Sequence, residues 1–318
     1  REMSDAKSLR VAYGEALVEL GRSEKSVVVL DADLAHATMT QLFADAYPER
    51  FFNYGIAEQN LMGAAAGFAH AGLIPFVSTF ALFGAGRAYE IIRNAIAYNN
   101  TNVKIACSHS GISVGEDGGS HQSFEDLALM RVVPNMTVLV PCDPIEMAKA
   151  VHAAVKIDGP VYLRVARPVV SNITSVETPF EVGKAVLLRD GNDVALVSTG
   201  LMSERALQAS ALLEAEGISA AVLHVHSIKP FDVEAVVTLA NRVRGMVSCE
   251  EHSVIGGLYS CVSEALVGNV EKGYRLEPVA LMDVFGRSGK PEDLFSFYHL
   301  TAQDIAKKAR SIYLEGGK

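Results

Sequence analysis

The stretch Tyr54-Gly55-Ile56-Ala57-Glu58-Gln59-Asn60-Leu61, with the later run Phe76-Val77-Ser78-Thr79-Phe80-Ala81-Leu82-Phe83, places one carboxylate between a glycine turn and dense apolar sequence. That carboxylate is Glu58. Residues 51–55 are predicted to form a short strand that ends in a turn, and residues 57–72 a helix rich in Gly and Ala. Glu58 then has two interpretations: a residue that complements the helix dipole, or a functional group held where the helix begins.

Apolar strands and amphipathic helices alternate on both sides of this stretch, a pattern typical of an α/β fold with a doubly wound sheet. Ser8 is the expected cap of the first helix, which Gly21 ends. The predicted strands are 27–30, 74–77, 103–107, 137–140 and 161–165, and the remaining helices are 87–98 and 145–155.

The alternation lapses between Pro168 and Lys184, where Pro, Ser, Thr and Asn dominate, and it then resumes. We therefore predict two doubly wound domains, residues 6–170 and a smaller one at 185–318, joined by a linker at 171–184. The second domain is predicted to contain strands 194–198, 220–225, 246–249 and 279–284, and helices 204–216, 233–241 and 258–267.

Composition narrows the function classes. The chain has 318 residues, 49% hydrophobic and 20% charged, which suits two packed domains, and its net charge of -9 argues against a nucleic-acid surface. The four cysteines are widely spaced, without the paired spacing of a zinc or redox site, so no residue is predicted to bind metal. No signal peptide or apolar run of about 20 residues is found, so we expect a cytoplasmic protein without a membrane segment.

Two polar clusters follow predicted strands, where open α/β sheets place their ligands. Asp31 and Asp33 end one strand, with helix capping as the alternative role. The glycine-rich loop from Gly111 to Gly119 carries Asp117 toward His121 and has little to pack, so it is more suited to a ligand than to a core. Solvated turn residues are the alternative for this pair.

Several of these motifs together resemble the pyrimidine-binding half of transketolases. They are Tyr54-Gly55-Ile56-Ala57-Glu58-Gln59-Asn60, Ser78-Thr79-Phe80 and Gly115-Glu116-Asp117-Gly118-Gly119-Ser120-His121-Gln122. The first motif is shared with the wider thiamine-diphosphate family, whereas the last is much closer to transketolase. The stretch Glu250-Glu251-His252-Ser253, with Gly256-Gly257, is similar to the transketolase C-terminal domain.

The resemblance implies a role for each matching residue. Glu58 would hydrogen-bond a ring nitrogen of the thiamine-diphosphate aminopyrimidine and so activate the cofactor, and Phe80 and Phe83 would hold that ring. Asp33 would lie near the cofactor and the subunit interface.

On the substrate side, the resemblance assigns two groups. His121 and Asp117 would orient sugar hydroxyls near the reacting carbon, and Arg10, His109 and Arg167 would bind a phosphate. Arg164 is the rival of Arg167, and their odd separation puts them on opposite faces of a strand. The family match favours Arg167; a surface salt bridge is the alternative role.

Two positions depart from the family pattern. Ala37 falls where transketolases have a serine that completes the phosphate grip, and Gly86 falls where they have a tyrosine. The donor and acceptor sugars therefore stay open, and a modified or sulfonated sugar is an alternative substrate.

The family's diphosphate-binding half, with its Gly-Asp-Gly motif and downstream Asn, has no counterpart here; the resemblance covers about the C-terminal half of a transketolase. It implies a split enzyme that transfers a two-carbon ketol unit from a ketose phosphate to an aldose phosphate. A separate N-terminal subunit would ligate magnesium or another divalent cation, in an α2β2 heterotetramer. A non-catalytic regulatory subunit is the alternative, and a nicotinamide-binding domain is disfavoured because no Gly-x-Gly-x-x-Gly follows a strand.

Overall fold

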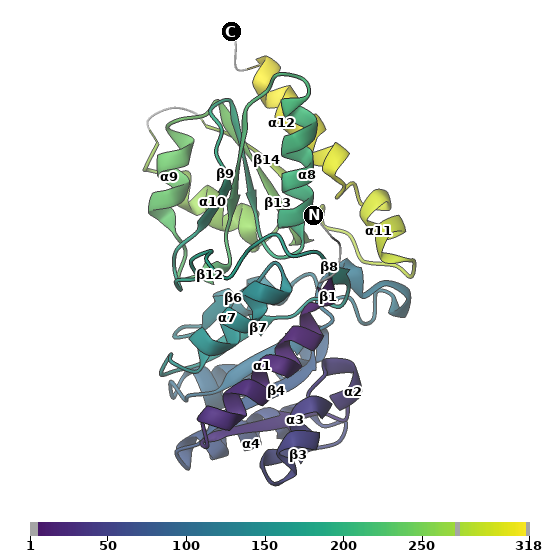
Figure 1. Ribbon diagram of the computed structural model, residues 1–318, viewed down its shortest axis with the longest axis vertical. Coiled ribbons are helices and arrows are strands. Elements are labelled where there is room, and N and C mark those ends of the chain that lie inside the picture. Colours follow the sequence, from purple (N-terminus) through teal and green to yellow (C-terminus); the bar gives the residue numbers. More distant parts are fainter. Residues whose placement is uncertain (1–5, 271–273, 316–318) are drawn as a thin grey trace.

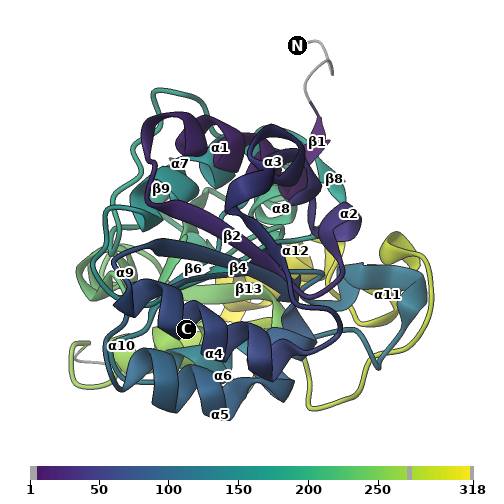
Figure 2. The same cartoon turned by 90° about the horizontal axis from the view of Figure 1, so that it is seen from below.

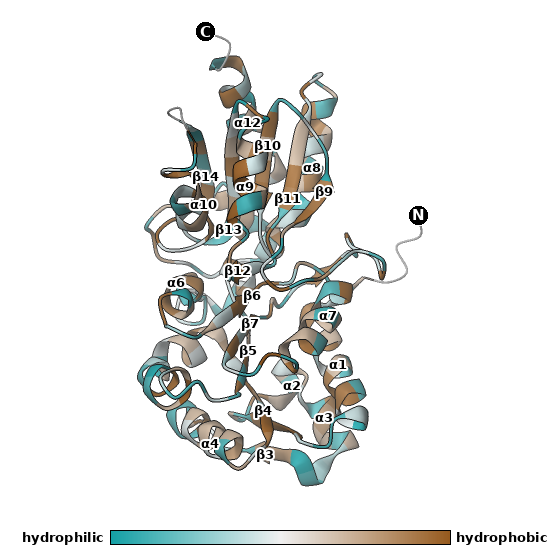
Figure 3. Ribbon diagram, turned by 90° about the vertical axis from the view of Figure 1, so that its left-hand side faces the viewer, coloured by the Kyte–Doolittle hydropathy of each residue, from teal (hydrophilic) through white to brown (hydrophobic). Residues whose placement is uncertain are grey.

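Two α/β domains are stacked end to end, with the chain passing from the lower to the upper domain in Figure 1. The computed structural model describes residues 6–270 and 274–315. The strands of both domains are mostly apolar, and the polar residues gather on helices and loops (Figure 3). This pattern is expected of parallel sheets that are covered on both faces.

The first domain contains a seven-stranded sheet in the order β12-β6-β7-β5-β4-β2-β3. All neighbours in it are parallel except β12, which runs antiparallel to β6. The strands are β2 (Val27–Asp31), β3 (Phe51–Asn53), β4 (Ile74–Phe80), β5 (Lys104–Ser108), β6 (Thr137–Leu139), β7 (Val161–Arg164) and β12 (Ser227–Lys229).

Helices cover both faces of this sheet (Figure 2). On one face lie α1 (Leu9–Ser23), α3 (Gln41–Ala46) and α7 (Pro144–Ala154), and on the other α4 (Glu58–His70), α5 (Tyr89–Ile91) and α6 (Asp126–Arg131). Short elements complete the domain: β1 (Lys7–Ser8), α2 (Ala35–Thr38), η1 (Pro48–Arg50) and η4 (Ile112–Asp117). Ser8 caps α1 as predicted, because its hydroxyl accepts a hydrogen bond from the Val11 amide at 3.4 Å.

The second domain has a five-stranded sheet in the order β14-β13-β10-β11-β9, with β9 antiparallel to its neighbour. Its strands are β9 (Val186–Arg189), β10 (Val194–Ser198), β11 (Ala220–His224), β13 (Gly245–Ser253) and β14 (Arg275–Leu281). Its helices are α8 (Met202–Glu214), α9 (Val233–Ala240), α10 (Leu258–Leu266), α11 (Pro291–Phe297) and α12 (Ala302–Glu315). The two doubly wound domains of the prediction are thus present.

The structure corrects several predicted elements. The helix predicted at 87–98 is broken into α5 between two π-helical segments, η2 (Leu82–Arg87) and η3 (Ile92–Ala97). Gly84 in η2 packs closely against β5, because a side chain there would lie 2.4 Å from Cys107 Sγ. The short strand β8 (Val169–Val170), which pairs with β1, was not predicted and lies at the end of the predicted first domain, just before the predicted linker at 171–184. Helices α2, α3, α6, α11 and α12 and strands β1, β9 and β12 were also not predicted.

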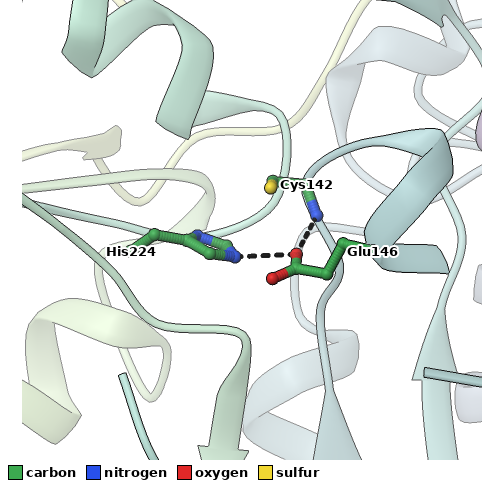
Figure 4. A group of neighbouring side chains, drawn as sticks. All are labelled: Cys142, Glu146 and His224. Atoms are coloured by element: carbon green, nitrogen blue, oxygen red, sulfur yellow. Dashed lines mark hydrogen bonds and ion pairs between the residues drawn. The ribbon is translucent and has the colours of Figure 1, made fainter. Parts of the chain in front are cut away.

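The domains are joined by more than the linker. Strand β12 follows β11 of the second domain yet pairs with β6 of the first. Figure 4 shows a second junction, where one carboxylate oxygen of Glu146 accepts hydrogen bonds from the Cys142 amide at 2.7 Å and from His224 Nε2 at 2.8 Å. Burial alone would raise the pKa of Glu146, but the charge and hydrogen bond of His224 lower it to about 2. The pair therefore fixes α7 to β11.

Cys142, Glu146 and His224 place their polar side-chain atoms within 4.8 Å of one another, a cluster that cysteine spacing in the sequence does not reveal. All four cysteines are free and buried. Within residues 6–270 and 274–315, no helix has the length and apolarity needed to cross a membrane.

Candidate active site

Most of the predicted site residues lie at one edge of the first sheet, where its parallel strands end. Asp33 follows β2, Glu58 follows β3, Phe80 ends β4, His109 follows β5 and Arg167 follows β7. Because the carboxyl ends of parallel strands share an edge, the order of these strands gathers residues that are up to 134 positions apart in the sequence, from Asp33 to Arg167.

Glu58 is the first residue of α4 and is only 4% exposed. The chain reaches it through a turn at Gly55, whose φ of 68° suits glycine. One face of α4 buries Leu61 and Met62 in the core, while Gly63 and Gly67 on the opposite face have no atom near a would-be side chain. Burial of this carboxylate carries a desolvation cost that an exposed first-turn residue would avoid, although a buried charge also interacts more strongly with the helix dipole. Both interpretations of Glu58 are compatible with this position.

Aromatic rings form a wall beside the end of β4. The Phe80 and Phe83 rings lie 5.9 Å apart at 24°, and the His109 ring stacks on Phe80 at 3.9 Å. His121 meets Phe83 edge-on at 5.4 Å. Four predicted residues from three different segments are thus brought together, and their ring faces could pack against a flat heteroaromatic ligand.

Asp117 belongs to a loop that contains η4 and ends near His121. The Asp117 carboxylate lies 3.7 Å from the Arg167 guanidinium, which also donates a hydrogen bond to the Val114 carbonyl. His121 Nδ1 lies 3.0 Å from the Ser120 hydroxyl. The loop therefore connects the candidate hydroxyl-binding residues to the candidate phosphate-binding residues.

Positive charge gathers beside this loop. Arg10 Nη1 donates to the Ala37 carbonyl at 2.6 Å, while its buried Nε has no partner among the described residues. Burial lowers the pKa of Arg10, and the nearby charge of Arg167 lowers it further. Two partly desolvated guanidinium groups that repel each other would both be stabilised by an anion between them.

His109 is held neutral in this setting. Burial, and then the charges of Arg10, Arg167 and His121, lower its pKa to about 3. Because the folded pKa lies below the ordinary value of 6.5, the unfolded chain takes up the proton first. The stability that neutral His109 contributes is therefore complete above pH 6.5 and is lost as the pH falls toward 3.

We predict a measurable consequence in His109→Gln, which cannot take up that proton. Relative to this variant, the wild-type chain should lose about 2 kcal/mol of unfolding free energy between pH 7.5 and pH 5. Urea denaturation of both proteins at the two pH values measures the difference. If the difference in unfolding free energy between wild type and His109→Gln is the same at both pH values, His109 takes up protons equally in the folded and unfolded states.

Other candidates have structural partners. Arg164 is buried in an ion pair with Asp126, at 2.8 Å from Nε to Oδ2, so it is part of the core. Asp31 is held by local hydrogen bonds, from the Leu34 amide at 2.6 Å and from two threonine hydroxyls, but it does not cap α2, which begins after Leu34 without a side-chain cap. Asp33 accepts a hydrogen bond from the Asn53 side chain at 3.0 Å. Among the described residues it makes no hydrogen bond to the aromatic wall or to the two arginines.

Three residues at the site were not predicted. Ser113 and Gln122 lie on the loop, and Glu251 reaches it from β13 with an oxygen 3.2 Å from the Ser113 amide. The available signal was the pair Glu250-Glu251 at the end of a predicted strand. Sequence alone does not show that this strand end meets the first domain.

Comparison with known proteins identifies the domains. The family model of the transketolase pyrimidine-binding domain matches residues 5–171, and that of the transketolase C-terminal domain matches residues 183–305. A Methanocaldococcus jannaschii protein named as a transketolase C-terminal section is 45% identical over 304 residues, 95% of each chain. A 6-deoxy-6-sulfo-D-fructose transketolase subunit of a Clostridium species is 39% identical and covers 96% of this chain and 94% of its own.

A solved structure described as a split gene transketolase, inactive beta4 tetramer, is 48% identical and has a TM-score of 0.89. The match covers 98% of this chain and 99% of that one. The chain therefore belongs to the transketolase family. Within that family it corresponds to the section that holds the pyrimidine-binding and C-terminal domains.

Proposed function

We propose that this chain is the C-terminal subunit of a split, thiamine-diphosphate-dependent transketolase. It transfers a two-carbon ketol unit between sugar phosphates when it is assembled with a separate diphosphate-binding subunit. The observation that carries the proposal is the grouping of an aromatic wall and paired guanidinium groups at the sheet edge that also holds buried Glu58. This edge of the sheet therefore holds candidate residues for binding the cofactor, the sugar hydroxyls and the phosphate.

The cofactor side fits the residues present. Phe80 is 8% exposed and forms a flat face with Phe83, suited to the aminopyrimidine ring. Glu58 would share a proton between its carboxyl oxygen and a pyrimidine nitrogen. When bound, the cofactor would supply the carbon nucleophile of ketol transfer.

The substrate side divides into two functions. The His121 ring and the Asp117 carboxylate would hydrogen-bond the ketose hydroxyls and fix the reacting carbon next to the cofactor. Arg10 and Arg167 would hold the phosphate at the far end, with neutral His109 as an additional hydrogen-bond partner. Arg167 would exchange its contact with Asp117 for the phosphate, which frees that carboxylate for the sugar.

Surface features support the need for a partner. The outer face of α4 has open space at Gly63 and Gly67, and Ile56 beside Glu58 is 79% exposed. A second subunit could pack its backbone closely there and close the cofactor site. The solved relative, described as an inactive tetramer of beta chains, agrees with a chain that needs this partner. The partner would supply the metal ligands in an α2β2 assembly.

Cofactor binding tests this arrangement. Titration of thiamine diphosphate with magnesium is carried out by calorimetry on this chain, on the candidate diphosphate-binding subunit, and on their mixture. We expect tight binding in the mixture only. Equally tight binding to the diphosphate-binding subunit alone would contradict a cofactor site shared between subunits.

A sulfonated ketose is a second candidate donor. Ala37, at the position of the family serine, contributes its backbone carbonyl to Arg10 and brings no hydroxyl to an anion. A relative that is 39% identical is named for a sulfonated fructose. Comparison of kcat/KM for a phosphorylated and a 6-sulfonated ketose in the same mixture distinguishes the two donors.

A further inference from the structure

The loop that carries Asp117 and His121, residues 109–122, is bounded on both sides of η4 by glycines in a conformation that other residues rarely adopt. Gly111 has φ 74° and ψ -171°, and Gly118 has φ 77° and ψ -172°. A Cβ atom at Gly111 would lie 2.3 Å from the Glu251 carboxyl group, and one at Gly118 would lie 2.5 Å from Ser288 Oγ. Atoms of the second domain thus occupy the space that side chains would need.

Glu251 holds this loop through a direct hydrogen bond. Its Oε2 accepts from the Ser113 amide at 3.2 Å, inside η4, and the residue is only 2% exposed. Its backbone carbonyl accepts from Arg164 Nη2 at 3.2 Å, which ties β13 to the end of β7. The backbone of Glu251 is therefore bonded to the first-domain sheet, and its carboxylate contacts the loop.

A second contact closes the loop at its far end. Gln122 is buried, and its Nε2 donates to the Arg287 carbonyl of the second domain at 2.9 Å. The same nitrogen lies 3.3 Å from the carbonyls of Ile112 and Gly115 within the loop. The second domain thus contacts the loop near its start, at its middle and at its end.

From these contacts we infer that Glu251 is a positioning residue: it holds residues 109–122 in the conformation that presents Asp117 and His121 to the ketose. This inference rests on the proposed function for its catalytic consequence. In the proposed site Glu251 would touch neither substrate nor cofactor. Glu251 would act through its hydrogen bond to the Ser113 amide. It would also act by filling the space beside Gly111, where the chain makes a turn that only glycine readily adopts, directly after His109 and Ser110.

The test compares Glu251→Ala and Glu251→Gln with the control Glu264→Ala in the reconstituted complex. Glu264 also bridges the domains, through Arg131 at 3.1 Å, but it lies away from the loop. Hydrogen exchange of peptides covering residues 109–122, followed by mass spectrometry, should be about 10-fold faster in Glu251→Ala. It should stay near the wild-type rate in Glu251→Gln, which keeps an acceptor oxygen, and in Glu264→Ala.

Kinetics supply the second readout. The KM for the ketose donor should rise about 10-fold in Glu251→Ala, with a smaller change in kcat and an unchanged affinity for thiamine diphosphate. The inference would be overturned if hydrogen exchange of residues 109–122 in Glu251→Ala stayed at the wild-type rate. It would also be overturned if exchange in Glu264→Ala were accelerated as much as in Glu251→Ala. If Glu251→Ala is insoluble, Glu251→Asp, which is too short to reach Ser113, replaces it. Absence of turnover in the wild-type mixture contradicts the proposed function alone, and the exchange comparison still decides the role of Glu251.

Discussion

Glu58→Gln should abolish most ketol transfer in the reconstituted complex, with a fall in kcat of at least about 100-fold. The amide has almost the shape of the carboxyl group, but it cannot share a proton with a pyrimidine nitrogen. Thiamine diphosphate should still bind, because the aromatic wall and the diphosphate-binding subunit are unchanged. Steady-state rates and cofactor titration on the same preparation measure the two effects.

Glu49→Gln is the matched control, since Glu49 lies on η1 with a side chain that is 69% exposed. It should turn over at the wild-type rate. Unchanged turnover in Glu58→Gln would contradict cofactor activation by this carboxylate. It would also restore the interpretation of Glu58 as a residue that only complements the helix dipole.

Arg167→Ala should lower kcat/KM for a phosphorylated ketose by about 10- to 100-fold, the loss expected when charge-assisted hydrogen bonds to an anion are removed. The same ketose without its phosphate should lose less than about 3-fold, because it makes no contact with the guanidinium group. The ratio of the two effects measures the phosphate contribution. It also separates binding of the anion from a general change of the site.

Arg242→Ala serves as the control for loss of one positive charge, because Arg242 pairs with Asp190 on the surface of the second domain at 2.5 Å. Arg242→Ala should leave kcat/KM unchanged for both the phosphorylated and the unphosphorylated ketose. Equal losses for the phosphorylated and unphosphorylated donors in Arg167→Ala would remove Arg167 from the phosphate site and leave it a structural partner of Asp117 and Val114.

Local sequence pattern predicted much of the fold. The buried run of β2, the Ser8 cap of α1 and the turn before Glu58 each depend on neighbours within a few residues, and each lies where it was predicted. The placement of the candidate site residues at strand ends follows from the same pattern, because parallel strands share one carboxyl edge.

Features that depend on distant contacts were missed. In η2, Gly84 packs on Cys107 of β5. Strand β12 pairs with β6, whose residues come 88 positions earlier, as in the pair Ser227 and Leu139. Glu251 meets Ser113 across 138 positions, and His224 meets Glu146 across 78. No short-range periodicity encodes such pairs. The roles of Glu58, His121 and the arginines stay predictions until they are measured.

Ketol transfer itself gives the most direct test of the two-subunit account. Transfer from xylulose 5-phosphate to ribose 5-phosphate is measured with thiamine diphosphate and magnesium, first with this chain alone and then with the diphosphate-binding subunit added. We predict turnover in the mixture and none with the chain alone. Turnover by the chain alone, or its absence in a stable complex that binds the cofactor, would contradict a split transketolase acting on sugar phosphates.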